Sequence, residues 1–202
     1  YRNDGLQNQY VVYRKKDNSN SSEEVFLDPN KFSEDGTISL TGLYFSEDGK
    51  LISYTISEGG SDWRKAIVMD TETKQIIGDT LTNIKFSGIS WKGNKGFYYS
   101  SYDKPEGSEL SEYTDRHKLY YHKLNTDQKS DKTVFGDQRE KYRYVSGIVS
   151  DDNNFLFISA SNLTDGNELY MIDLRKNSNR VQTISDDPST DDYVVDNVDE
   201  TF

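Results

Sequence analysis

The sequence predicts an all-β protein, because three observations together indicate short antiparallel strands arranged in repeats. The apolar stretches are rich in Tyr, Phe, Ile, Val and Thr, which favour strands. No stretch of eleven residues keeps an apolar stripe at helical spacing better than it keeps alternation. One pattern, an apolar stretch, a turn rich in Asp, Asn and Gly and a second apolar stretch, occurs three times, with turns beginning at Ser46, Trp91 and Ser150. The spacings of 45 and 59 residues between these hairpins are typical of the blades of a β-propeller.

The repeats divide the chain into about three complete four-stranded blades and parts of two more. The first unit, about 1–40, holds two expected strands at 9–14 and 24–28, and the last, 192–202, begins another unit. Both ends look cut, so we interpret the chain as a partial propeller from a longer protein. Four short antiparallel strands in one repeat make one blade. The complete units and their expected strands are 41–80 (42–45, 50–57, 64–70, 74–77), 84–136 (86–90, 95–102, 118–124, 132–135) and 143–185 (144–149, 154–161, 168–174, 181–184).

The complete units differ in one loop and share one feature of their first strands. The third unit carries an expected insertion at 103–116, which contains Pro105 and Gly107. The first strands of the third and fourth units contain Gly88 and Gly147. Because first strands are the innermost ones in a propeller, we expect these glycines to relieve crowding around the central channel.

Composition and charge exclude several classes of function. A net charge of −11, from 35 acidic and 24 basic residues, would repel a nucleic-acid backbone, so DNA and RNA binding is not expected. The absence of cysteine excludes disulfides, a thiol nucleophile and cysteine-ligated zinc. No apolar segment is long enough to span a membrane, and the first residues show no signal-peptide pattern. The sequence leaves the compartment open between cytoplasm and periplasm.

No set of side chains along the chain forms a recognisable catalytic or metal site. The α/β-hydrolase motif Gly-x-Ser-x-Gly is absent, and the nearest string, at 59–63, lacks the last glycine. His117 and His122 are five residues apart, an odd offset that puts them on opposite faces of a strand. We therefore expect surface or packing histidines and no shared metal. The paired acids at 151–152 and 186–187 fall in expected turns. We expect no catalytic residue, metal or cofactor in this chain.

Rarer strings beside the hairpins resemble one peptidase family. They run in order along the chain: Gly-Leu-Gln-Asn-Gln at 5–9, Leu-Asp-Pro-Asn at 27–30, Ser-Asp-Trp at 61–63, Gly-Phe-Tyr-Tyr at 96–99 and His-Lys-Leu-Tyr-Tyr-His at 117–122. In this combination the chain is similar to the prolyl oligopeptidases, serine peptidases that cleave short peptides on the C-terminal side of proline. The resemblance covers essentially the whole chain.

The resemblance implies an architecture and a role. Family members have a seven-bladed propeller inserted near the front of an α/β-hydrolase domain that carries the Ser, Asp and His of the triad. This chain would then be about the first half of the propeller and would itself be non-catalytic. Its partners would be the hydrolase domain of the same polypeptide and short proline-containing peptides. In such enzymes the propeller covers the active site and admits only small peptides, which is specificity by access.

The resemblance also implies four site residues. Phe86 matches a phenylalanine that lines the apolar pocket on the N-terminal side of the cleaved residue, and Tyr144 and Thr164 fall at further lining positions. Asp62 matches an acid that faces a substrate-binding arginine of the hydrolase domain. Ser161 stands where some members have an arginine, so the local charge differs.

Other interpretations of the same residues stay open at this point. Phe86 could be a buried packing residue, and Asp62 could be a turn acid that caps Trp63. The chain could be a stand-alone TolB-like binding propeller, or belong to an oligopeptidase B-like enzyme that cuts after Lys or Arg. A partial propeller also exposes strand edges, so edge-to-edge self-association is a further expectation.

Overall fold

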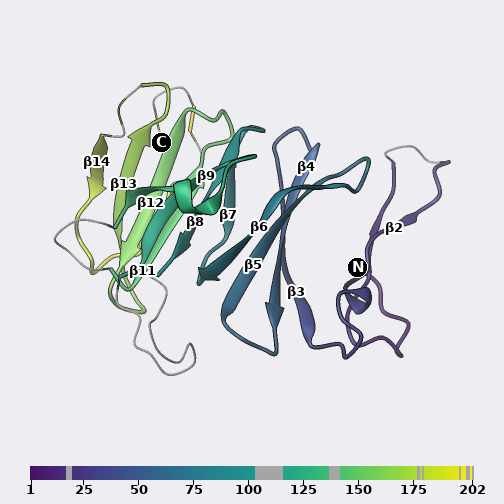
Figure 1. The fold of residues 1–202 in the computed structure, drawn as a ribbon. Coiled ribbons are helices and arrows are strands. Elements are labelled where there is room, and N and C mark those ends of the chain that lie inside the picture. The colour runs from purple at the N-terminus through teal and green to yellow at the C-terminus, as the bar shows by residue number, and fades with distance from the viewer. Residues whose placement is uncertain are drawn as a thin grey trace.

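The computed structural model describes residues 1–16, 20–102, 116–136, 142–176, 178, 180–195, 197, 198 and 201. They form one two-stranded sheet followed by three four-stranded antiparallel sheets, which succeed one another along the chain (Figure 1). This arrangement confirms the prediction of an all-β protein built from propeller blades. Apart from Arg116, the expected insertion at 103–116 lies outside the described residues.

Each sheet is built from strands that are consecutive in sequence. In every four-stranded sheet the first strand lies at one edge and the last at the other, as in a propeller blade. The described helical segments are two three-residue turns, and neither has the length or apolarity of a membrane span. The elements are β1 (Val12–Arg14), β2 (Glu24–Leu27), η1 (Pro29–Lys31), β3 (Ile38–Phe45), β4 (Leu51–Glu58), β5 (Trp63–Asp70), β6 (Ile76–Lys85), β7 (Ile89–Lys92), β8 (Gly96–Ser101), β9 (Lys118–Lys123), η2 (Gln128–Ser130), β10 (Lys132–Phe135), β11 (Tyr144–Val149), β12 (Phe155–Ser161), β13 (Glu168–Asp173) and β14 (Val181–Ser185).

Most strands lie within a few residues of their predicted positions, but β6 does not. The sequence predicted a short strand at 74–77 and an inner strand at 86–90, whereas β6 runs from Ile76 to Lys85 and β7 starts at Ile89. The register between β5 and β6 shifts twice, and Gly78 and Asn83 take positive φ angles of 68° and 57° near these shifts. Such bulges let a strand continue through residues that locally favour a turn.

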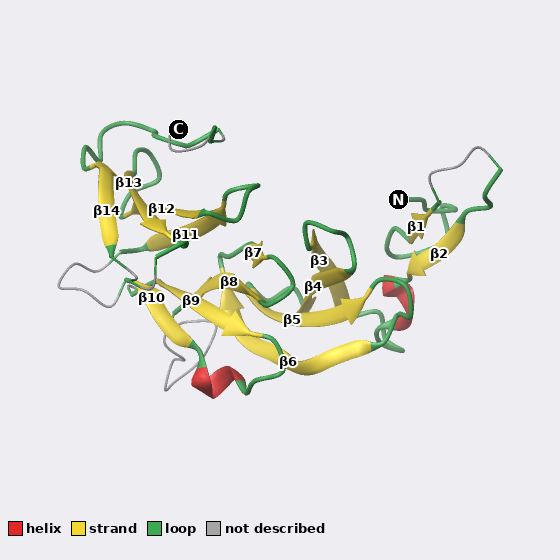
Figure 2. Cartoon of the chain, turned by 90° about the horizontal axis from the view of Figure 1, so that it is seen from above, coloured by secondary structure: helices red, strands yellow, loops and turns green. Residues whose placement is uncertain are grey.

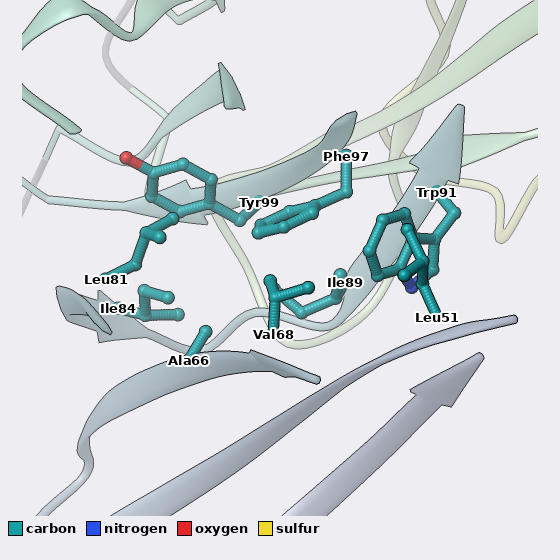
Figure 3. Packing of buried hydrophobic residues seen from close by; sticks show 9 residues of the cluster. All are labelled: Leu51, Ala66, Val68, Leu81, Ile84, Ile89, Trp91, Phe97 and Tyr99. Carbon is teal, nitrogen blue, oxygen red and sulfur yellow. The ribbon is translucent and has the colours of Figure 1, made fainter. Parts of the chain in front are cut away.

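The hydrophobic core lies between sheets, in separate layers. Figure 3 shows one layer, where β4, β5 and β6 meet the next sheet. Trp91 and Phe97 form an edge-on aromatic pair there, 5.2 Å between centroids, and the Trp91 indole donates to the Tyr44 carbonyl of the preceding sheet. The second strands β4 and β8 have neighbours on both faces, so almost every residue in them is buried. The members of this layer are Leu51, Ala66, Val68, Leu81, Ile84, Ile89, Trp91, Phe97 and Tyr99.

The antiparallel order gives the array two distinct faces. Seen from above, the sheets succeed one another around an arc, and the first strands β3, β7 and β11 are neighbours (Figure 2). We call the face on which these three strands begin the strand-start face. Because successive strands are antiparallel, the β4–β5 and β12–β13 loops lie on it too. The β3–β4, β7–β8 and β11–β12 turns lie on the opposite, hairpin-turn face.

Hydrogen bonds join the hairpin turns of neighbouring blades. The Gly93 amide donates to Asn153 Oδ1 at 2.7 Å, and Asn94 Nδ2 donates to Asp48 Oδ2 at 2.8 Å. The same turn of the last sheet is bonded to the C-terminal segment, where Asn197 Nδ2 donates to Asp152 Oδ2 at 2.8 Å. The Asp-, Asn- and Gly-rich turns, which the sequence marked as the repeat, therefore also hold the blades in register.

The two glycines of the first strands meet different surroundings. A Cβ on Gly147 would lie 2.7 Å from Leu119 Cδ2 of the preceding blade, whereas one on Gly88 would lie 3.6 Å from the Tyr44 ring, an ordinary contact. The expected crowding therefore exists at Gly147 only, and a neighbouring blade rather than the channel causes it.

We expect Gly147→Ala to lower the free energy of unfolding by about 1–3 kcal/mol, because overpacking forces Leu119 from its place. The same change at Gly88 is the matched control and should stay within about 0.5 kcal/mol. Urea unfolding followed by circular dichroism measures both. Equal losses in the two variants would contradict the difference in packing.

Candidate functional site

All four residues implied by the resemblance lie on the strand-start face. Phe86 lies between the end of β6 and the start of β7, and Tyr144 is the first residue of β11. Asp62 lies in the β4–β5 loop and Thr164 in the β12–β13 loop. The antiparallel topology alone thus gathers residues that are far apart in sequence on one surface.

Phe86 is an exposed aromatic residue on a strained backbone. Its φ is +49°, a left-handed conformation that a bulky side chain rarely takes, and 44% of the residue is exposed. The ring meets Tyr144 and Tyr102 edge-on, with centroids 5.9 and 6.3 Å apart. Lys85 Nζ lies 5.2 Å from the Phe86 centroid and 5.0 Å from the Trp63 ring. The interpretation of Phe86 as a buried packing residue is therefore wrong.

Tyr144 is half-buried and completes the aromatic surface next to Phe86. Its backbone pairs with Ser161 at the start of the β11–β12 ladder, which fixes the position of the residue. The Arg143 guanidinium lies 5.3 Å from the Tyr144 ring centroid. We call Phe86, Tyr102 and Tyr144 the aromatic cluster. Two cationic side chains, Lys85 and Arg143, flank it, so its apolar surface has a positive border.

Asp62 and Thr164 are exposed and do not contact the aromatic cluster through any hydrogen bond or ion pair in the described part of the chain. Ser61, rather than Asp62, caps the turn, because its hydroxyl accepts the Trp63 amide at 3.1 Å. Ser161 organises the other loop, since its hydroxyl donates to Gly166 O at 2.7 Å. The Trp63 amide is thus capped by the Ser61 hydroxyl.

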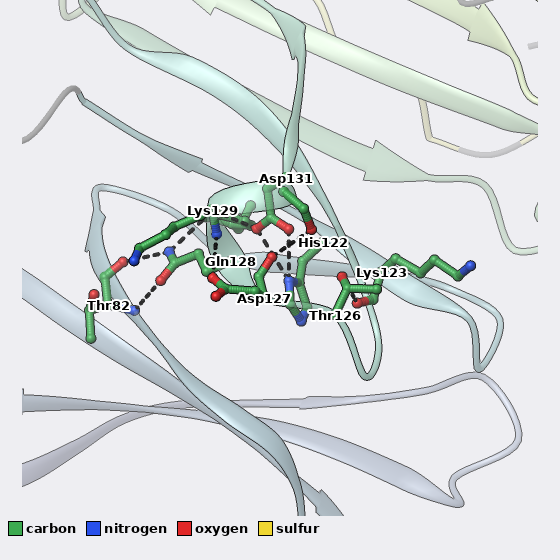
Figure 4. Close-up of polar contacts among 10 residues, drawn as sticks. Thr82, His122, Lys123, Thr126, Asp127, Gln128, Lys129 and Asp131 are labelled. Atoms are coloured by element: carbon green, nitrogen blue, oxygen red, sulfur yellow. Dashed lines mark hydrogen bonds and ion pairs between the residues drawn. The ribbon is translucent and has the colours of Figure 1, made fainter.

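The two histidines are buried packing residues on different sides of their blade. His122 contacts Phe97 and Asp131, with Nδ1 2.9 Å from Asp131 Oδ1. The Tyr99 hydroxyl donates to the other Asp131 oxygen at 2.9 Å. Figure 4 shows how this network continues to the preceding blade, where Gln128 receives the Thr82 amide (3.0 Å) and donates to its carbonyl (2.8 Å). The network therefore joins two blades and lies apart from the strand-start face.

His117 lies directly beneath the aromatic cluster, a position the sequence did not reveal. Its side chain is fully buried, its ring stacks on Tyr102 with centroids 4.4 Å apart, and burial lowers its pKa to about 4. The sequence does contain a signal for this position. Tyr102 directly follows β8 and His117 directly precedes β9, so the pairing of these two strands brings the two residues together at one end.

The described residues contain no group of three or more His, Asp or Glu side chains that could hold a metal ion. The arrangement offers the exposed ring of Phe86, the half-buried ring of Tyr144 and two flanking cations. The aromatic rings can supply apolar contact to a bound molecule, and Lys85 and Arg143 can supply positive charge.

Fold and surface together define a propeller scaffold that presents an aromatic cluster on one face. The chain matches, over residues 1–202, the family described as prolyl oligopeptidase, N-terminal beta-propeller domain. It therefore belongs to that family, as the strings at 5–9, 27–30 and 61–63 predicted.

Curated relatives and solved structures agree with this assignment. The chain is 53% identical over 186 residues to a prolyl endopeptidase of Elizabethkingia miricola and 52% identical over 185 residues to that of Elizabethkingia meningoseptica. These matches cover 92% and 91% of this chain and 26% of each relative. Prolyl oligopeptidase B from Galerina marginata superposes with a TM-score of 0.82 at 26% identity, covering 98% of this chain and 30% of that one. The chain thus spans about a quarter of the length of the curated relatives it matches.

Proposed function

We propose that this chain is the propeller part of a serine endopeptidase that hydrolyses short peptides on the C-terminal side of proline. In this proposal the chain performs no catalysis itself. It covers an α/β-hydrolase domain of the same polypeptide and restricts the active site to small peptides. A folded protein cannot enter an opening narrower than itself, so the propeller selects substrates by size.

Family membership and length support the assignment of the parent activity. The curated relatives at 53% and 52% identity are named prolyl endopeptidases, and this chain corresponds to 26% of each. The members of the family are the N-terminal propellers of prolyl oligopeptidases. In those proteins the propeller therefore accompanies a catalytic domain.

The contact between the exposed Phe86 ring and the half-buried Tyr144 ring is the observation that carries the proposed site. Backbone strain at an exposed aromatic residue is costly and persists at binding sites where the surroundings enforce it. We propose that Phe86, Tyr144 and Thr164 line the pocket for an apolar residue on the N-terminal side of the cleaved proline. Asp62, exposed on the same face, would face a cationic substrate-binding group of the hydrolase domain.

The full-length reading frame tests the parent activity. A Gly-x-Ser-x-Gly motif followed by Asp and His, and a purified protein that cleaves short peptides after proline but not folded proteins, are expected. Cleavage after Lys or Arg would favour the oligopeptidase B-like alternative. A frame without a hydrolase domain would favour the stand-alone propeller, and either result would overturn the proposal.

In the full-length enzyme we expect Phe86→Ala to raise KM for proline peptides about tenfold, because about 1.4 kcal/mol of aromatic contact is lost. The turnover number should change little, since Phe86 does not belong to the triad. Phe45→Ala is the matched control, an exposed phenylalanine at the end of β3 on the hairpin-turn face. Steady-state kinetics of both variants measure the effect, and unchanged KM in Phe86→Ala would sink the assignment.

A further inference from the structure

His117 makes three hydrogen bonds that join three blades at one point. Its backbone amide donates to Tyr142 O at 2.8 Å, its Nε2 lies 2.9 Å from Lys85 O, and its Nδ1 lies 2.8 Å from the Val145 amide nitrogen. Lys85 ends β6, His117 precedes β9 and Val145 lies in β11, so the three partners come from successive blades.

The partners of His117 define its protonation state. The Val145 amide can only donate, so Nδ1 must accept, and the Lys85 carbonyl can only accept, so Nε2 must carry the hydrogen. The imidazole is therefore neutral, in a single tautomer set by two backbone groups. A charged imidazolium would present a second N–H toward the Val145 amide, and this bond would be lost.

Two hydrogen bonds of the His117 side chain go to residues that are chain neighbours of Phe86 and Tyr144. Lys85 is the residue before Phe86, and Val145 is the residue after Tyr144. The imidazole thus fixes the backbone on one side of each. The left-handed backbone of Phe86 needs such restraint, because an unstrained conformation would turn the ring away.

Tyr102 extends this support to the ring itself. It stacks on His117 with an interplanar angle of 28°, its hydroxyl donates to Arg143 O, and its edge meets the Phe86 ring. Tyr102 thus bonds to Arg143, the residue before Tyr144, while His117 bonds to Val145, the residue after it.

We propose that His117, with Tyr102 stacked on it, is a positioning residue that holds Phe86 and Tyr144 in the arrangement that receives the peptide. His117 touches no substrate in this scheme and acts through the backbone of their neighbours. The inference rests on the proposed function for its effect on peptides, but the arrangement it describes can be tested without any peptidase activity.

The first test uses the wild-type protein and no substrate. Imidazole ¹⁵N chemical shifts at pH 7 should show His117 as the neutral Nε2–H tautomer. The Val145 amide should exchange slowly with solvent, as should the Val149 amide of the same strand, which donates to Ser90 Oγ at 2.8 Å. In His117→Phe, which keeps the stack but loses both side-chain bonds, only Val145 should lose protection, by tenfold or more. An Nδ1–H tautomer, or equal changes at both amides, would overturn the proposal.

The second test asks whether the arrangement serves peptide binding in the full-length enzyme. His117→Phe should raise KM for proline peptides about fivefold with a smaller change in kcat, and His117→Gln, whose amide can both donate and accept, should recover part of this. His122→Phe is the matched control, a buried histidine of β9, the strand that His117 precedes; it contacts Asp131. It should lower stability and leave KM unchanged. Equal KM effects in the 117 and 122 variants would show a general structural role and overturn the proposal.

The two tests separate the possible failures. If the full-length protein cleaves no proline peptide, the proposed function fails while the tautomer and the Val145 exchange still decide the positioning role. If His117→Phe does not fold, the wild-type shifts and exchange rates decide it.

Discussion

Leu81→Ala is expected to lower the free energy of unfolding by about 2–5 kcal/mol, because the substitution removes buried methyl groups and leaves a cavity. Leu81 is 1% exposed and lies in the layer between two blades (Figure 3). A propeller blade buries its apolar residues mainly against its neighbours, so this layer holds adjacent blades together. Urea unfolding measured by circular dichroism gives the difference from wild type.

Leu163→Ala is the matched control for that experiment. Leu163 is 67% exposed in the β12–β13 loop, so its truncation should change the free energy of unfolding by no more than about 0.5 kcal/mol. A loss at Leu163 comparable to that at Leu81 would contradict the assignment of the core to the layers between sheets.

The contribution of His117 to the free energy of unfolding should fall by up to about 3 kcal/mol as the pH is lowered from 6.5 to 4. Burial, opposed by the bond to the Lys85 carbonyl, lowers its pKa from 6.5 to about 4 in the folded state. Between these values the unfolded chain binds the proton and the folded chain does not, so acid favours unfolding. Below pH 4 both states are protonated and this loss levels off. Chemical denaturation at a series of pH values measures the slope.

Hydrogen-bonded carboxylates change the free energy of unfolding in a different pH range, so their effect can be distinguished from that of His117. The Lys50 amide holds the pKa of Asp48 low, and the Ser150 hydroxyl does the same for Asp152. Their stabilisation is present above the ordinary value of 3.8 and is lost as the pH falls from there. The slope between pH 6.5 and 5 therefore reports histidine. His117→Gln should flatten it, whereas the same slope in His117→Gln and wild type would refute its assignment to this residue.

Local patterns were sufficient for the blade order. Alternation and turn residues are properties of a few adjacent residues, and they placed the hairpins around 46–50 and 150–154 where the structure has them. They failed at β6, since Gly78 locally favours a turn while pairing with β5 carries the strand on to Lys85. Strand length there depends on a partner strand, which no local pattern contains.

The candidate site was predictable only in part. The family strings pointed to Phe86 and Tyr144 separately, but they contained nothing about the left-handed backbone of Phe86 or the ring contact between the two. His117 was expected to be a surface or packing histidine, and it is indeed buried. Its role beneath the cluster follows from hydrogen bonds to residues 32 and 28 positions away in sequence.

The sequence by itself determined the all-β class, the succession of blades and membership of the prolyl oligopeptidase propeller family, because these depend on side-chain alternation, turn chemistry and short strings. Only the tertiary structure decided which residues of different blades meet. That outcome depends on how whole sheets pack against one another, and the packing is set by many weak contacts along each layer rather than by any one segment. The aromatic cluster and the histidine beneath it exist because three blades meet at that point.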